Sequence, residues 1–179
     1  MNYDNLCMGC MSELYDQKQC PNCGHYVDSP QMSPYLPLKT LIGGKYIIGK
    51  AVSSNSEGIS YMAFDVDKRV PVVLREFFPE GIASRKHDKK AVMVDETLQD
   101  TYFSLLNDFL DMWRNIARIR GFSALLPVLD ILEENNTAYV VTEYIESLSL
   151  REFLLRSKTG YLNWEKAKLL FMPVLSLLS

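Results

Sequence analysis

The four cysteines of the chain lie within its first 23 residues, as two Cys-x-x-Cys pairs. Cys7 and Cys10 form the first pair, Cys20 and Cys23 form the second, and nine residues separate them. Each pair can direct two thiolates at one cation, so two pairs complete a tetrahedral site of four sulfurs. The spacing therefore predicts a structural zinc site, and Gly24 supplies the permissive backbone after the second pair.

Two alternative roles for these cysteines are less favoured. Two disulfides would need an oxidising compartment, but the N-terminal residues have neither the basic nor the apolar region of a secretory signal. A redox dithiol would account for one pair and not for two. His25 follows the second pair. With four thiols available, we expect it to support the site from outside or to be exposed.

The charge of the chain bears on its partners. Residues 1–30 carry Lys18 against four carboxylates, so this surface would repel phosphate. The net charge of −3 gives no general reason to expect nucleic acid or an anionic membrane. The longest apolar run, 169–178, is about half of what a bilayer needs. We therefore expect protein partners, no nucleic acid, no membrane segment in this chain and a cytoplasmic location.

The elements that would position these residues follow from composition and periodicity. A hydrophobic fraction of 47% with 23% charged residues excludes a disordered or fibrous chain. Three prolines between residues 28 and 37 predict a stiff, extended linker that uncouples the cysteine-bearing head from the body.

In the body, β-rich runs predict strands at 45–52, 59–65, 70–77, 125–132 and 137–144, with a short strand left open at 91–94. Apolar residues at helical spacing predict helices at 97–120, 148–156 and 164–179. The charge run 85–90 predicts a solvated loop in which His87 is exposed.

Four motifs stand in order on these elements. They are Lys45-Tyr46-Ile47-Ile48-Gly49, Gly58-Ile59-Ser60-Tyr61-Met62-Ala63-Phe64-Asp65, Arg75-Glu76-Phe77-Phe78-Pro79 and Asn136-Thr137-Ala138-Tyr139-Val140-Val141-Thr142-Glu143-Tyr144. From about Lys39 onward, the chain resembles the small lobe of a bacterial eukaryotic-like Ser/Thr protein kinase.

This resemblance implies an α+β fold. It predicts a five-stranded antiparallel sheet with one long helix (the αC helix of that family), followed by the first helices of the large lobe and preceded by the small zinc ribbon. The predicted division is a four-cysteine zinc ribbon at 1–27, a Pro-rich linker at 28–38, a kinase-like small lobe at 39–146 and the start of a large lobe at 147–179, where we expect the fold to be truncated.

The resemblance also places a nucleotide pocket. Adenine would dock on the hinge backbone around Glu143 and Ile145, behind Thr142 at the gatekeeper position. Gly58 is the third glycine of the phosphate loop, Val73 replaces a small alanine against adenine, and Arg75 stands at the position of the phosphate-binding lysine.

The residues at this pocket depart from the family pattern. Ser53 and Asn55 replace the first two loop glycines, and Arg75 is longer and forked where a lysine is expected. Met112 stands where a helix glutamate should pair with that lysine, and Asp111, one residue away, would point elsewhere. The chain contains neither His-Arg-Asp nor Asp-Phe-Gly, so we assign no catalytic residue and expect at most weak ATP binding.

Three functions compete on these observations. The favoured one is a non-catalytic, pseudokinase-type signalling or protein-interaction module with a structural zinc ribbon. The second is a fragment of an active ATP-dependent Ser/Thr kinase whose catalytic half lies beyond residue 179. The third is a zinc-ribbon protein-binding adaptor in which the lobe is a spacer. Because the last helix is apolar nearly all round, we also expect the chain to self-associate through it, with Leu170, Leu177 and Leu178 contributing.

Overall fold

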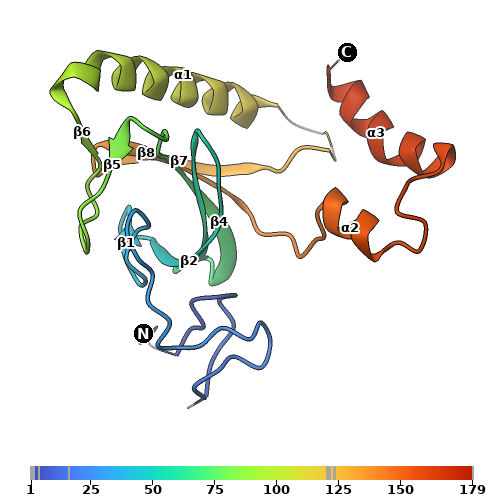
Figure 1. The fold of residues 1–179 in the computed structure, drawn as a ribbon, viewed down its shortest axis with the longest axis horizontal. Helices are drawn as coiled ribbons and strands as arrows, with labels where there is room; N and C mark the ends of the chain where they lie inside the picture. The colour runs from blue at the N-terminus through green and yellow to red at the C-terminus, as the bar shows by residue number, and fades with distance from the viewer. Residues whose placement is uncertain (1–2, 4, 16, 120–121, 123, 179) are drawn as a thin grey trace.

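The computed structural model describes residues 3, 5–15, 17–119, 122 and 124–178. Its centre is a curled antiparallel sheet with strand order β1-β2-β3-β4-β8-β7 (Figure 1). The strands are β1 (Leu41–Ile42), β2 (Tyr46–Ser54), β3 (Gly58–Asp65), β4 (Val70–Phe77), β7 (Val128–Glu134) and β8 (Thr137–Glu143). The five long strands occupy the segments predicted from the sequence, and β7 starts three residues later than expected.

The sixth strand corrects the prediction of a five-stranded sheet. β1 pairs Ile42 with Tyr46 through a turn at Gly43 and Gly44, which both have positive φ. Two glycines tolerate this left-handed backbone, so the chain reverses within a few residues and adds an edge strand too short to be recognised from periodicity. The strand left open at 91–94 forms as β6 (Met93–Val94), which pairs with β5 (Ala83–Ser84) outside the main sheet.

One long helix covers the sheet at the upper edge of Figure 1. A 3₁₀ turn at Glu96–Leu98, capped by Asp95, leads into α1 (Gln99–Arg118). Tyr102 and Phe109 of α1 pack on Phe77 of β4, with ring centroids 5.4 and 5.1 Å apart. The predicted helix is confirmed, although its expected end at residue 120 falls outside the described residues.

The most buried polar group of the fold is an ion pair. Glu76 on β4 is fully buried and accepts hydrogen bonds from Arg85 and from the hydroxyl of Tyr61, the latter at 2.9 Å. Burial raises the pKa of Glu76, and the facing Arg85 and Tyr61 oppose that shift. Arg85 was predicted in a solvated loop, and the structure corrects this: Arg85 is 7% exposed, whereas His87 is exposed as expected. A charge that is buried to this extent needs a partner of opposite charge, and the periodicity of the sequence does not show which residue provides it.

The segment at 28–38 packs against the sheet instead of separating the head from the body. Leu36 is fully buried in the core, and its amide donates to the Tyr61 hydroxyl. The Gln31 side-chain amide donates to Leu36 O and Gly49 O, and Arg85 donates to Pro34 O at 2.6 Å. The prediction of an uncoupling linker is therefore wrong, because prolines stiffen a segment but do not decide whether it finds hydrogen-bond partners.

The cysteine-bearing head also packs directly on the sheet. Met8 O accepts a hydrogen bond from the Lys50 amide at 2.6 Å, where the β2–β3 ladder is irregular. Leu6, Met8 and Met11 form a buried cluster with Met62 of β3. At Gly49, a Cβ atom would overlap both Met8 O and the methyl carbon of Met11. Only glycine allows this close approach.

The C-terminal part consists of α2 (Leu150–Arg156) and α3 (Trp164–Leu178), which lie to one side of the sheet in Figure 1. Ser149 and Glu152 cap α2 in a reciprocal capping box. The apolar side chains of α3 are exposed: Trp164, Leu169, Leu170, Phe171, Met172, Val174 and Leu175. Within the described residues, neither of these helices nor α1 is both long and apolar enough to cross a bilayer.

We predict that Arg85→Met will lower the free energy of unfolding by about 3 kcal/mol, because it leaves the Glu76 carboxylate buried without a positively charged partner. Chemical denaturation of the full chain measures this value. The control is Arg151→Met on α2, which removes an exposed charge and should change stability by less than about 0.5 kcal/mol. Equal effects of the two substitutions would contradict the assigned role of the pair.

We predict that the chain self-associates through α3, since each exposed leucine that becomes buried contributes roughly 1.5–3 kcal/mol. Changing Leu169 and Leu170 to Gln should shift sedimentation toward the monomer, whereas Leu105→Gln on α1 should not. A wild-type chain that sediments as a monomer at high concentration would refute this. The side chains of Leu177 and Leu178, also expected to contribute, lie outside the structural description.

Candidate functional site

The four cysteines come together as predicted. Their Sγ atoms all lie within 4.8 Å of one another, and the four thiols are free. Cys7 Sγ lies 3.5 Å from Cys23 Sγ, and Cys10 Sγ lies 3.8 Å from Cys20 Sγ. Sulfurs about 2.3 Å from a tetrahedral metal ion would be about 3.8 Å apart, so the arrangement fits a tetrathiolate metal centre.

Two short turns position the sulfurs. Isolated bridges join Leu6 to Glu13 and Gln19 to Tyr26, so each Cys-x-x-Cys pair stands on its own hairpin-like turn. The Gly9 amide donates to Cys7 Sγ at 3.3 Å. The two turns also pack closely, because a Cβ atom at Gly9 would lie 2.9 Å from Cys23 Sγ. These contacts between protein groups hold the sulfurs close together.

The sulfurs differ in their electrostatic surroundings. Burial raises the pKa of Cys7 to about 12. Burial acts in the same direction at Cys20, but backbone amides of Cys23 and Asn22 and the Ser12 hydroxyl outweigh it and lower that pKa to about 6. Amides that point at sulfur favour the thiolate, which is the form that binds metal.

His25 packs beside the cysteines without being required as a ligand. Its Nε2 atom is buried and has no hydrogen-bond partner among the described residues. Burial and the positive charge of Lys50 lower its pKa, so the neutral ring is favoured. The expectation that His25 is a supporting or exposed residue agrees with this placement, since four sulfurs already complete the cluster.

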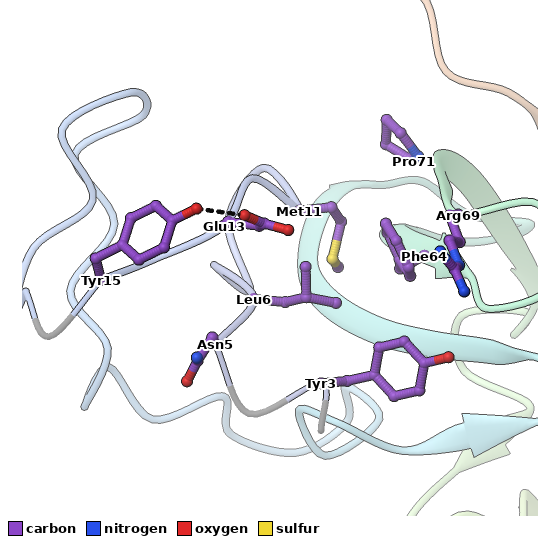
Figure 2. A pocket seen from close by; sticks show the side chains of 9 residues that line it. All are labelled: Tyr3, Asn5, Leu6, Met11, Glu13, Tyr15, Phe64, Arg69 and Pro71. Atoms are coloured by element: carbon purple, nitrogen blue, oxygen red, sulfur yellow. Dashed lines mark hydrogen bonds between the residues drawn. The ribbon is translucent and has the colours of Figure 1, made fainter. Parts of the chain in front are cut away.

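The head also borders a hollow on the sheet, shown in Figure 2. Tyr3, Leu6 and Met11 line it from the head, and Phe64 and Arg69 line it from the sheet side. At the rim of the hollow, the Tyr15 hydroxyl donates a hydrogen bond to the Glu13 carboxylate at 2.6 Å, drawn as a dashed line in Figure 2. None of the predicted nucleotide residues lines this hollow, although Phe64 and Pro71 share a sheet face with Val73 and Arg75.

The predicted nucleotide-pocket residues lie on adjoining strands. Val73 of β4 faces Thr142 of β8 and Met62 of β3 in register, and Arg75 faces Ser60. Alternation along a strand therefore puts Val73, Arg75 and Thr142 on one face of the sheet. On the same face, the head packs over Met62, the β3 neighbour of Val73, and buries it.

Arg75 is bound to the loop between β2 and β3 and not to α1. One guanidinium nitrogen lies 2.5 Å from Glu57 Oε2 and 3.0 Å from Asn55 Oδ1, and the other lies 3.4 Å from Ser60 Oγ. The arginine is therefore held mainly by Asn55 and Glu57 of this loop.

The helix position that should carry a glutamate offers no carboxylate. Met112 is 41% exposed on α1, so it is neither an ion-pair partner nor a core residue. The Asp111 carboxylate lies 3.6 Å from Arg114 on the same helix, and this agrees with the prediction that it points elsewhere. Within the described residues, no ion pair joins α1 to Arg75.

Gly58, the one loop glycine that matches the family pattern, has a structural reason to be glycine. It pairs with Phe77, and a Cβ atom there would overlap Glu76 O. The residue is therefore required by the close approach of β3 to β4, whether or not a phosphate binds.

The hinge residues are placed at the end of β8. Thr142 is buried, Glu143 ends the strand, and Ile145 lies beyond it with 52% of its surface exposed. The structure thus places Gly58, Val73, Arg75 and Thr142 on neighbouring strands, while Ile145 follows the end of β8 and is about half exposed.

Sequence reasoning missed three contacts: Glu57 on Arg75, Glu76 on Arg85, and the docking of Met8 and Met11 at Gly49. The last had a visible signal, because Met8 lies between the first two cysteines and Met11 directly follows them. The ion pairs had none, since each joins residues that only the fold brings together.

Comparison with known proteins bears on the fold. The structure matches the apo form of PpkA-294, from a bacterial Ser/Thr kinase, with a TM-score of 0.64 and 28% sequence identity. The match covers 70% of this chain. The fold is kinase-like. The kinase-like chain spans 44% of the PpkA-294 structure, which is less than half its length. No family model matches the sequence, and no curated protein does.

Proposed function

We propose that this chain is a non-catalytic, kinase-like module that binds other proteins and carries a structural zinc ion. The division into a zinc ribbon at 1–27, a connecting segment at 28–38, a small lobe at 39–146 and the start of a large lobe at 147–179 belongs to the same proposal. Two parts of the chain support it separately: the cysteine cluster and the altered nucleotide face.

The contact of Arg75 with Glu57 is the observation that carries the non-catalytic assignment. In an active kinase, the equivalent cation grips the nucleotide phosphates and pairs with a helix carboxylate. Here the cation is tied to the chain's own loop at 2.5 Å, and Met112 offers no carboxylate. Weak ATP binding through Glu143 and Ile145 remains part of the proposal.

Zinc is the metal that best suits the cysteine cluster. Four thiolates in tetrahedral array are typical of structural zinc sites, which keep no open position for substrate. Cys7, Cys10, Cys20 and Cys23 would hold the ion. The head then supplies a folded surface that is acidic in sequence, which favours protein partners over nucleic acid.

A second candidate is a fragment of an active Ser/Thr kinase. One observation favours it: the similarity to PpkA-294 covers only 44% of that structure, so the catalytic half of such a fold would lie outside this chain. The third candidate, a zinc-ribbon adaptor with the lobe as spacer, is less favoured, because the head is packed on the lobe through Lys50 and Met62.

We predict one zinc ion per chain after purification under reducing conditions, measured by elemental analysis. Chelation should destabilise the lobe as well as the head, because Met8 and Met11 would leave Met62 and Gly49. For a protein of this size, each kcal/mol lost lowers Tm by about 2–4 °C.

Hydrogen exchange separates this effect from general unfolding. After chelation the exchange rate of the Lys50 amide, which donates to Met8 O, should rise by a larger factor than that of the Val140 and Val141 amides in β8, which follow only the global stability of the lobe. Zinc-free protein at purification, or an unchanged Lys50 amide, would contradict the prediction.

We predict that calorimetric titration with ATP will show weak binding that depends little on magnesium, because Arg75 is already paired and the sequence lacks the Asp-Phe-Gly motif that holds magnesium in kinases. The matched comparison is Arg75→Lys, which restores the family's residue type but leaves Met112 in place, and should improve binding only slightly. Tight, magnesium-dependent binding to the wild-type chain would refute the non-catalytic function and favour the kinase fragment.

A further inference from the structure

The loop between β2 and β3 holds a carboxylate against the guanidinium of Arg75. Glu57 Oε2 lies 2.5 Å from Arg75 Nη2, and the arginine side chain is only 18% exposed. Among the described residues, Glu57 is the only carboxylate within ion-pair distance of this arginine. The charge of Arg75 is thus neutralised from within the same hairpin.

The loop is shaped to keep Glu57 in this place. The Asn55 side-chain oxygen accepts hydrogen bonds from the amides of Glu57 at 3.2 Å and Gly58 at 3.0 Å, and also accepts from Arg75. Asn55 N in turn donates to Gly58 O at 3.0 Å, which closes the turn. Glu80 N donates to Ser56 O and ties the loop to the segment after β4.

A guanidinium binds carboxylates and phosphates with the same planar donor fork. A carboxylate held at contact distance therefore competes directly with any oxyanion that approaches the same nitrogens. The Ser60 hydroxyl, 3.4 Å from Arg75 Nη1, completes a small polar group on this face of the sheet.

We infer that Glu57 acts as a built-in competitor: its carboxylate occupies the donors of Arg75, beside the Ser60 hydroxyl, and thereby weakens the binding of a phosphate-type oxyanion there. The inference deepens the proposed function, on which it rests for the expectation that the wild-type chain binds ATP weakly. It adds a cause: the site is filled by the chain itself and is not simply missing.

Removing the substitute ligand should therefore uncover the site. Pyrophosphate is titrated by calorimetry into the full-length wild-type chain and into Glu57→Gln, which keeps the shape of residue 57 without its charge. We expect affinity to increase about fivefold in the variant, the size expected for loss of one partly exposed ion-pair competitor. ATP should gain by a similar factor, and adenosine should gain nothing.

Three controls make the result specific. Glu80→Gln removes the same charge beside the loop without touching Arg75 and should leave affinity unchanged. The double variant Glu57→Gln with Arg75→Met should lose the gain. Should Glu57→Gln fail to fold, Glu57→Asp retains the charge on a shorter arm and should show a smaller gain in the folded chain.

The inference is overturned if the folded Glu57 variants show no gain, if Glu80→Gln gives an equal gain, or if the double variant keeps it. An increase in affinity for ATP without an increase for pyrophosphate also overturns it, since the substitution would then act on binding of the adenine base and not of the phosphates. The proposed function fails on a different measurement, namely tight magnesium-dependent binding of ATP by the wild-type chain.

Discussion

The buried ion pair of Glu76 and Arg85 is the interaction on which the arrangement of the other parts depends. Both side chains are almost wholly shielded from water, so each must satisfy the other. Arg85 also donates to Pro34 O and Lys90 O, and Glu76 accepts from Tyr61. One pair of charges thereby connects β4, β3, the proline-bearing segment and the loop before β6. An apolar pair could fill the same volume, but it could not bind the backbone carbonyls of these loops.

The position of the head follows from this connection. Once Pro34 is held by Arg85 and Leu36 enters the core, residues 31–38 lie along β2, and the preceding cysteine turns are brought to the sheet. Gly49 then allows Met8 and Met11 to approach the backbone closely. The four cysteines, which could hold a metal ion, therefore stand in a head that packs on the same sheet face as Val73 and Arg75.

On that face, the steric requirements of the kinase-like fold can be separated from the residues on which the proposed loss of phosphate binding rests. Gly58 is retained because β3 approaches β4 closely, and a loss of nucleotide binding would not relax that steric requirement. Arg75 keeps a cation in the strand, but the charge is balanced by Glu57 from the adjacent hairpin. Met112 is exposed, so the helix that would supply a carboxylate does not pair with the sheet at this point. Fold and phosphate site thus depend on different residues.

Spacing and periodicity, which act over a few residues, were enough to predict the local features: the four-sulfur cluster, the five long strands and the long amphipathic helix. Which charges are paired and which segments are docked depends on contacts between distant parts of the folded chain. Arg85 belongs to a charge run that predicts a solvated loop, the prolines predict a spacer, and Glu57 carries no signal beyond that of a polar loop. Their partners come from other segments of the chain, and burial, which makes such pairing necessary, is a property of the folded chain alone.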